Sequence, residues 1–373
     1  MIIISSIVIG LCFVTVYIID DQKNRMYQTS SDVKKYLETD ESQAKQIIAT
    51  CKSDMHCSVN ALNNMSKKEN QESVLTTFSN LVSLYDKSNY PCHETAHHLG
   101  MWLYGYTQNL EMALPYAKQL CGGAVFHGVL QGFFMTQHFH NVNSTKIMIT
   151  KLCPMNHDNS YSIIRWQCLH GIGHGLAEFY DYDILTAVAH CDEFQPGWEQ
   201  ISCSKGVFMQ NVVHYYETGK GDFDKDDLFS PCDKVSEKYA SACYHYHASY
   251  ILKKKGFGLE TTFDECDKII PSKFVKFCYH GMGRQMSSVA YADMNQGIID
   301  CHIGKQQNYH VDCLRGMLMT LVNRNTNPDI GFQFCSISKE DFKVDCYDSM
   351  GKWIKMLYST RQEMEKECSK AEN

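Results

Sequence analysis

Apolar side chains recur at helical spacing along most of the chain. In the segment 72–84 they stand at Val74, Leu75, Phe78, Leu81 and Val82. The segments 180–190, 234–242 and 293–300 show the same spacing. A spacing of three and four residues places apolar side chains on one face of a helix, whereas a strand requires strict alternation. We therefore predict an all-α fold.

One segment is apolar on every side. Residues 2–19 form an 18-residue run without a charge, which is just long enough to span a bilayer, while the core of a cleaved signal peptide is usually shorter. Lys23 and Arg25 follow the run and favour a cytoplasmic location for what comes next, but the cysteines described below favour the opposite side. We predict a single-pass signal-anchor at residues 1–19 with the remaining chain extracytoplasmic, or a secreted protein if the segment is cleaved.

A short motif recurs through the rest of the chain. Its clearest copy is Cys168-Leu-His-Gly-Ile-Gly-His174, and related copies begin at Cys203, Cys243, Cys278, Cys313 and Cys346. Successive copies are separated by 35, 40, 35, 35 and 33 residues. A period in this range is typical of arrays in which each repeat is one supersecondary unit. In period and hairpin logic, residues 90–365 resemble the tetratricopeptide and Sel1-like solenoids, a resemblance that implies stacked α-hairpins.

A second cysteine precedes each motif cysteine at a nearly constant distance of 11 to 15 residues. We expect each pair to form a disulfide between the end of one helix and the start of the next, and to add roughly 2–4 kcal/mol of stability. Two more pairs lie nearer the N-terminus, while Cys12 and Cys368 have no obvious partner. The predicted pairs are Cys51–Cys57, Cys92–Cys121, Cys153–Cys168, Cys191–Cys203, Cys232–Cys243, Cys266–Cys278, Cys301–Cys313 and Cys335–Cys346.

Glycines stand inside the predicted motif helices, where they destabilise a helix relative to alanine. Their repeated use predicts close contact between neighbouring helix backbones, at Gly128, Gly171, Gly206, Gly281 and Gly316. The chain then divides into four parts. These are the signal-anchor (1–19), a polar helical stalk (20–89), the Cys/His-rich α-hairpin repeats (90–352) and a C-terminal capping helix (353–373).

The composition of the chain argues against several classes of function. The chain has 373 residues, with 35 basic and 42 acidic side chains and a net charge of -7, and no basic patch stands out, so we expect no nucleic-acid partner. Its 18 regularly spaced cysteines indicate an oxidising compartment. Cysteines used in disulfides are not thiol nucleophiles, and the sequence has neither a Gly-rich phosphate loop after a strand nor a Gly-x-Ser-x-Gly elbow.

The first candidate for chemistry is His93-Glu94-Thr-Ala-His97, which matches the HExxH signature and resembles the zincin metallopeptidases. On a helix, residues four apart share a face, so His93 and His97 can bind one metal ion. The resemblance implies that Glu94 is the general base. The third histidine of the metzincins would fall at Leu103, so the best third ligand is Glu178.

The second candidate is a column of histidines. His127, His170, His245 and His280 stand two residues after the motif cysteine or its equivalent, where other copies have Lys205 and Arg315. His98 and His174 stand six residues after it. If the second helices stack, these side chains line one surface, and zinc or copper would suit such a cluster. Methionines on the same helices would add soft ligands that favour Cu(I), namely Met209, Met282, Met286, Met317 and Met319. The alternative is a structural column whose members bond to backbone or face an anion, with the methionines as core filler.

Two functions from different classes follow. The first is binding or scaffolding of protein partners on the concave surface of a membrane-anchored helical-repeat protein. The alternative is a Zn- or Cu-dependent protein, with a zincin-like hydrolase as one form of it. The candidate metal ligands are His93, His97, His98, His127, His170, His174 and Glu178, and the candidate catalytic residue is Glu94.

Overall fold

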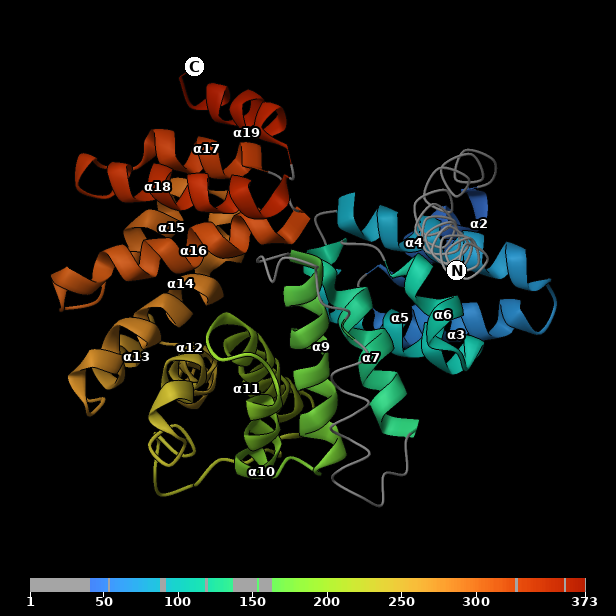
Figure 1. Cartoon of the computed structure of the whole chain (residues 1–373), viewed down its shortest axis with the longest axis horizontal. Coiled ribbons are helices and arrows are strands. Elements are labelled where there is room, and N and C mark those ends of the chain that lie inside the picture. Colours follow the sequence, from blue (N-terminus) through green and yellow to red (C-terminus); the bar gives the residue numbers. More distant parts are fainter. Residues whose placement is uncertain are drawn as a thin grey trace, which may run out of the picture.

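The computed structural model describes residues 41–52, 54–87, 92–117, 120–136, 153, 163–325, 328–358 and 360–372. Every regular element among these residues is a helix (Figure 1), which confirms the all-α prediction. Eight longer helices carry the repeated motif and its variants. They are α5 (Cys92–Thr107), α7 (Ala124–Thr136), α9 (Ile163–Phe179), α11 (Trp198–Thr218), α12 (Glu237–Lys254), α14 (Val275–Ala292), α16 (His310–Asn325) and α18 (Glu340–Leu357).

Short helices alternate with the long ones and complete the hairpins. They are α6 (Leu110–Ala113), α10 (Ile184–Ala189), α13 (Leu259–Cys266), α15 (Met294–Cys301) and α17 (Pro328–Ile337). The described disulfides join the eight pairs that the spacing predicts, with Cα atoms 5.4 to 5.7 Å apart. Cys368 is free and exposed, and Cys12 lies outside the described residues. Each repeat disulfide therefore joins the segment that precedes a long helix to the first two turns of that helix.

The long helices pack against one another in chain order, from α5 through α7, α9, α11, α12 and α14 to α16. Glycines allow this packing, as the sequence predicts. A methyl group on Gly128 would overlap the carbonyl oxygen of His97, and one on Gly206 would overlap that of His170. Gly281 and Gly316 stand in the same relation to the preceding long helix. Side chains near these crossings therefore reach directly from one helix to the next.

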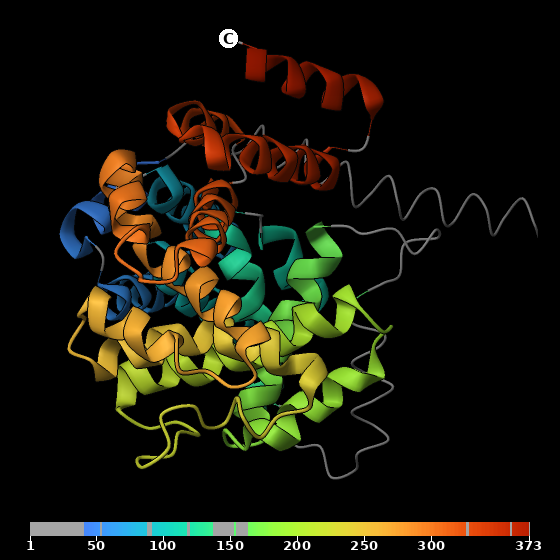
Figure 2. The ribbon, with the colours of Figure 1, turned by 90° about the vertical axis from the view of Figure 1, so that its left-hand side faces the viewer.

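The array of long helices curves until α16 returns to the turn between α5 and α7, while α18 lies beyond it (Figures 1 and 2). Helix α16 contacts the 3-10 turn η2 (Cys121–Gly123), which also contacts α5 and directly precedes α7. Across this junction Gln167 Nε2 of α9 donates a hydrogen bond to Asn323 Oδ1 of α16 at 3.5 Å. Residues 156 positions apart in the sequence are thus brought together. The long helices therefore surround one common interior.

The N-terminal helices do not form the predicted stalk. Helices α2 (Ser42–Cys51), α3 (Met55–Ser66) and α4 (Gln71–Lys87) share a hydrophobic core with α5. Phe78 of α4 stacks on Trp102 of α5 with ring centroids 5.8 Å apart, and Trp102 Nε1 donates to Asn63 Oδ1 at 2.8 Å. The apolar residues of this segment are buried against the repeats together with a few small polar ones, such as Ser58 and Thr77, and most of its charged residues lie on the outer face.

Two further predictions concern the ends of the chain. The proposed signal-anchor at 1–19 lies outside the described residues, and no helix among those described is long and apolar enough to cross a bilayer. At the C-terminus the predicted boundary at 352/353 falls inside α18, which continues to Leu357. The capping role passes to α19 (Arg361–Cys368), which begins with a capping box between Thr360 and Glu363 and packs on α18.

Candidate metal centre

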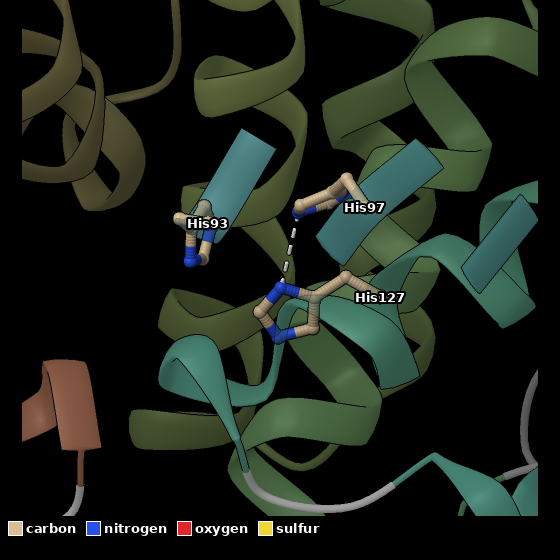
Figure 3. Close-up of side chains that lie close together, drawn as sticks. All are labelled: His93, His97 and His127. Carbon is tan, nitrogen blue, oxygen red and sulfur yellow. Dashed lines mark hydrogen bonds between the residues drawn. The ribbon is translucent and has the colours of Figure 1, made fainter. Parts of the chain in front are cut away.

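Five histidines from three consecutive long helices converge in the interior. His93 and His97 come from α5, His127 from α7, and His170 and His174 from α9. The pairs on α5 and α9 are four residues apart, so each pair shares one helix face. His127 lies between them, with ring centroids 5.2 Å from His97 and 4.8 Å from His170. Figure 3 shows the first three rings facing one another.

Close backbone contact explains why rings on different helices meet. A methyl group on Gly171 would stand only 3.1 Å from His127 Cα, so α7 and α9 approach closely where their histidines lie. Four of the rings are almost fully buried, with His174 at 0% and His127 at 1% exposure. The potential ligand atoms form two groups that share His127, one with His93 and His97 and one with His170 and His174, and within each group they lie within 4.8 Å of one another.

The hydrogen bonds of four histidines determine which ring nitrogen carries the proton. His93 Nδ1 lies 2.8 Å from the carbonyl oxygen of Cys121, and His170 Nδ1 lies 3.2 Å from that of Ser202. A carbonyl oxygen only accepts, so Nδ1 is the donor in both rings and Nε2 keeps its lone pair. His174 Nδ1 similarly lies 2.8 Å from Gln210 Oε1, and His97 Nδ1 faces Gln131 Oε1 at 3.3 Å.

Glu178 orients the two glutamines. Its Oε1 accepts hydrogen bonds from Gln131 Nε2 at 2.7 Å, from Gln210 Nε2 at 2.8 Å and from the Tyr182 hydroxyl at 3.0 Å. An ionised carboxylate can only accept, so both amides must turn their NH2 groups to Glu178 and their oxygens to the histidines. One carboxylate therefore determines the tautomers of two imidazoles on different helices.

His127 differs from the other four rings because it donates through Nε2 and not through Nδ1. Its Nε2 donates to Gln167 Oε1 at 2.5 Å, so Nδ1 keeps the lone pair. That Nδ1 faces His97 Nε2 at 3.3 Å, although neither atom has a proton to offer. The Nε2 atoms of His93 and His174 are buried without a hydrogen-bond partner. The cluster thus holds buried acceptor nitrogens that face one another without donors.

Electrostatics keep these imidazoles neutral. Burial lowers the pKa of all five rings, and repulsion between the imidazoles lowers the pKa of His97, His127 and His170 further. The pKa of His93 falls to about 4 and that of His174 to about 3. A neutral imidazole is the form that binds a metal ion. The buried rings are therefore ready to act as ligands at neutral pH.

The structure separates the predicted site residues into two sets. Five of the seven predicted ligands lie in the cluster. Glu178 is not in the cluster but accepts hydrogen bonds from Gln131 and Gln210, which in turn contact the cluster histidines. His98 points elsewhere: its Nδ1 donates to the carbonyl oxygen of Glu94 at 3.0 Å, and its Nε2 lies 3.7 Å from Glu217 Oε1. Glu94 is exposed on α5. The helix face that carries His93 and His97 points into the cluster, and the predicted general base therefore points away from it.

The sequence did not reveal the glutamines that hydrogen-bond to the candidate ligands. Gln131 and Gln167 are buried polar residues on α7 and α9, and Gln131 could have been found because it stands four residues after His127. Gln210 had no comparable signal. Most of the methionines considered for copper lie in the hydrophobic core, where Met209, Met282, Met286 and Met317 are buried.

Comparison of the chain with family models, with curated proteins and with solved structures finds no match. The resemblance to tetratricopeptide and Sel1-like arrays and to zincins therefore stays a prediction from the sequence. The function has to be inferred from the geometry of the cluster.

Proposed function

We propose that the five-histidine cluster is a transition-metal centre. The observation that carries this proposal is the direction of the lone pairs. In every ring one nitrogen is hydrogen-bonded to a protein acceptor. The second nitrogens of His93 and His174 are buried without a partner, and those of His97 and His127 face each other without a proton between them. Metal-binding histidines have this arrangement because the outer hydrogen bond fixes the tautomer and the ring orientation. A structural column would instead use both nitrogens in hydrogen bonds.

Zinc is the first candidate ion. The cluster offers only neutral imidazoles, which suit zinc, copper, iron and nickel and do not suit magnesium or calcium. Zinc imposes no geometric preference of its own, so it fits three or four rings that approach from three helices. The buried methionines are in the core, which removes the soft ligands that would favour Cu(I).

The chemistry depends on how many histidines an ion takes. With three protein ligands, zinc keeps an open position and lowers the pKa of a bound water to about 7. His93, His97 and His127 would form one such set, and His127, His170 and His174 the other. Because Glu94 is exposed, we do not assign the general-base role of a zincin to it. The hydrolase interpretation therefore depends on the metal and not on the HExxH glutamate.

The disulfides support a location outside the cytoplasm. Eight disulfides among the described residues would not persist in a reducing cytosol. We keep the proposal that the chain is exported and tethered by residues 1–19. Scaffolding of protein partners stays a prediction, because no observation identifies a partner surface.

Elemental analysis of the oxidised chain tests the metal proposal. The protein is purified without a polyhistidine tag or chelator, dialysed against zinc and then against metal-free buffer. We expect about one zinc per chain, since buried structural or catalytic zinc is held tightly and the single free lone pair of His127, which both ligand groups share, can bind one ion. His127→Ala removes the histidine that both groups share and should lose the metal, whereas His56→Ala, which changes an exposed histidine, should retain it. Folded wild-type protein with metal well below one per chain would overturn the proposal.

A further inference from the structure

A second group of polar side chains lies next along the array of long helices, beyond the histidine cluster. Lys205 comes from α11, His245 and Tyr246 from α12, and His280 and Arg284 from α14. Lys205, His245 and His280 occupy the repeat position of His170, two residues after the motif cysteine, and Arg284 occupies that of His174. Because α9, α11, α12 and α14 pack in that order, this group continues the face that carries the proposed metal ligands.

Direct contacts join the group to the histidine cluster. His245 Nδ1 and His280 Nδ1 are 3.0 Å apart, and the His245 ring lies 4.7 Å from Tyr246. The guanidinium of Arg284 lies 4.7 Å above the Tyr246 ring. Tyr246 in turn lies 6.3 Å from His170, centroid to centroid. Tyr246 is therefore the bridge between the basic group and the proposed metal centre.

The two cations of this group lack acidic partners. Among the described residues no carboxylate lies within ion-pairing distance of Lys205 or Arg284. Lys205 Nζ lies 5.5 Å over the Trp166 ring, and Arg284 Nη1 donates to Ser249 Oγ at 3.3 Å. Arg315 makes the contrast clear. It occupies the same repeat position as Lys205 but pairs with Asp312 at 3.2 Å and Asp345 at 3.1 Å.

The positive charges of Lys205 and Arg284 repel each other, which is unfavourable without a nearby negative charge. Burial and then the positive charge of Arg284 lower the pKa of Lys205 to about 8, so Lys205 is still mostly protonated at neutral pH. The Nε2 atom of His245 is buried without a hydrogen-bond partner, and that residue is only 2% exposed. Buried charges and polar groups of this kind are normally paired. Lys205, His280 and Arg284 are each half-buried, so these residues keep some exposed surface.

We propose that Lys205 and Arg284 bind the oxyanion of a small ligand, a phosphate or carboxylate group, beside the histidine cluster. Arginine binds both anions through two parallel hydrogen bonds, and lysine supplies a point charge. His245 Nε2, buried in the same group, is the third contact, and it donates to the anion in the tautomer in which His280 Nδ1 donates to His245 Nδ1. The proposal deepens the metal-centre proposal, since a ligand held at Lys205 and Arg284 would extend past Tyr246 towards the metal. The binding of the anion itself does not require the metal.

Calorimetric titration with inorganic phosphate and, separately, with acetate tests this site. The full chain is used in both metal-free and zinc-loaded form, at constant ionic strength kept with chloride. We expect saturable binding of one of the two anions by the wild type. Lys205→Met and Arg284→Gln should each weaken it by about tenfold to a hundredfold, the loss expected for a hydrogen bond to a charged group. Arg315→Gln, which removes an equivalent but paired charge, should bind like the wild type.

The outcomes separate the two proposals. Anion binding that depends on Lys205 and Arg284 in protein that takes up no zinc would reject the metal centre and support the anion site. Zinc uptake without saturable phosphate or acetate binding would overturn the anion site alone. Binding restricted to the zinc-loaded form and unchanged in both variants would place the anion on the metal, and would also overturn it. If Lys205→Met fails to fold by circular dichroism, Arg284→Gln decides the result.

Discussion

Glu178 provides the sharpest test of how the cluster is organised. It is not a ligand, yet its Oε1 accepts hydrogen bonds from Gln131, Gln210 and Tyr182. Glu178→Met removes that acceptor at similar length. Both glutamines can then rotate, and the Nδ1 protons of His97 and His174 are no longer fixed. Loss of such an outer hydrogen bond typically weakens metal binding 10- to 100-fold, which corresponds to about 1.4–2.7 kcal/mol.

The assay is a zinc competition titration against a chromophoric chelator at pH 7.5. Glu178→Gln is the matched control, because its amide oxygen can still accept from both glutamines, so it should lose much less affinity than Glu178→Met. Chemical unfolding of the metal-free proteins checks that both variants are folded. If Glu178→Met binds zinc as tightly as the wild type while folded, the tautomers of His97 and His174 do not depend on Glu178, and the reasoning is refuted.

Three further predictions concern stability, each measured by urea unfolding of metal-free protein. Glu199→Ala removes the two hydrogen bonds of 2.7 and 2.9 Å that Glu199 accepts from the buried guanidinium of Arg165, and should cost about 3–5 kcal/mol because the charge loses its carboxylate partner; a loss below ~1 kcal/mol would contradict this. Gly206→Ala would overlap a backbone carbonyl of α9 and should destabilise by about 1–3 kcal/mol, whereas Gly105→Ala, which meets no neighbouring atom, should stabilise by up to about 1 kcal/mol. Burial holds the pKa of His174 at about 3 in the folded state against 6.5 unfolded. The unfolded state therefore binds the proton first, and stability should fall by about 1.4 kcal/mol for each pH unit below 6.5; equal stability at pH 7.5 and 5.5 would argue against a neutral buried ring.

The sequence predicted those features that depend on local spacing. A nearly constant distance between Cys301 and Cys313, or between their counterparts, specifies a hairpin closed by a disulfide. Helical periodicity places His170 and His174 on one face. Glycine at Gly128 or Gly206 is a poor helix residue, so its recurrence indicated the helix crossings. These patterns were enough to predict an all-α array and to place the five clustered histidines among seven candidate ligands.

The rest depends on contacts between distant segments, which spacing does not encode. The role of Glu178 requires Gln131 from α7 and Gln210 from α11 to meet on one oxygen. The segment predicted as a stalk looked polar because a helix that buries one face keeps polar residues on the other. The HExxH pattern specifies that His93 and His97 share a face, but whether Glu94 faces the metal depends on which side of α5 the neighbouring helices cover.

The junction between α9 and α16 has a consequence for biosynthesis. Gln167 holds the Nε2 proton of His127, and its own amide is bonded to Asn323. The proposed ligand histidines are made early in translation, but Asn323, which bonds to the Gln167 amide, follows 156 positions after Gln167. A chain still being synthesised or exported would therefore have its histidines without their final arrangement. High-affinity loading would wait for the last repeats to arrive, so a chain truncated before α16 should emerge oxidised at its early cysteines yet poor at retaining metal.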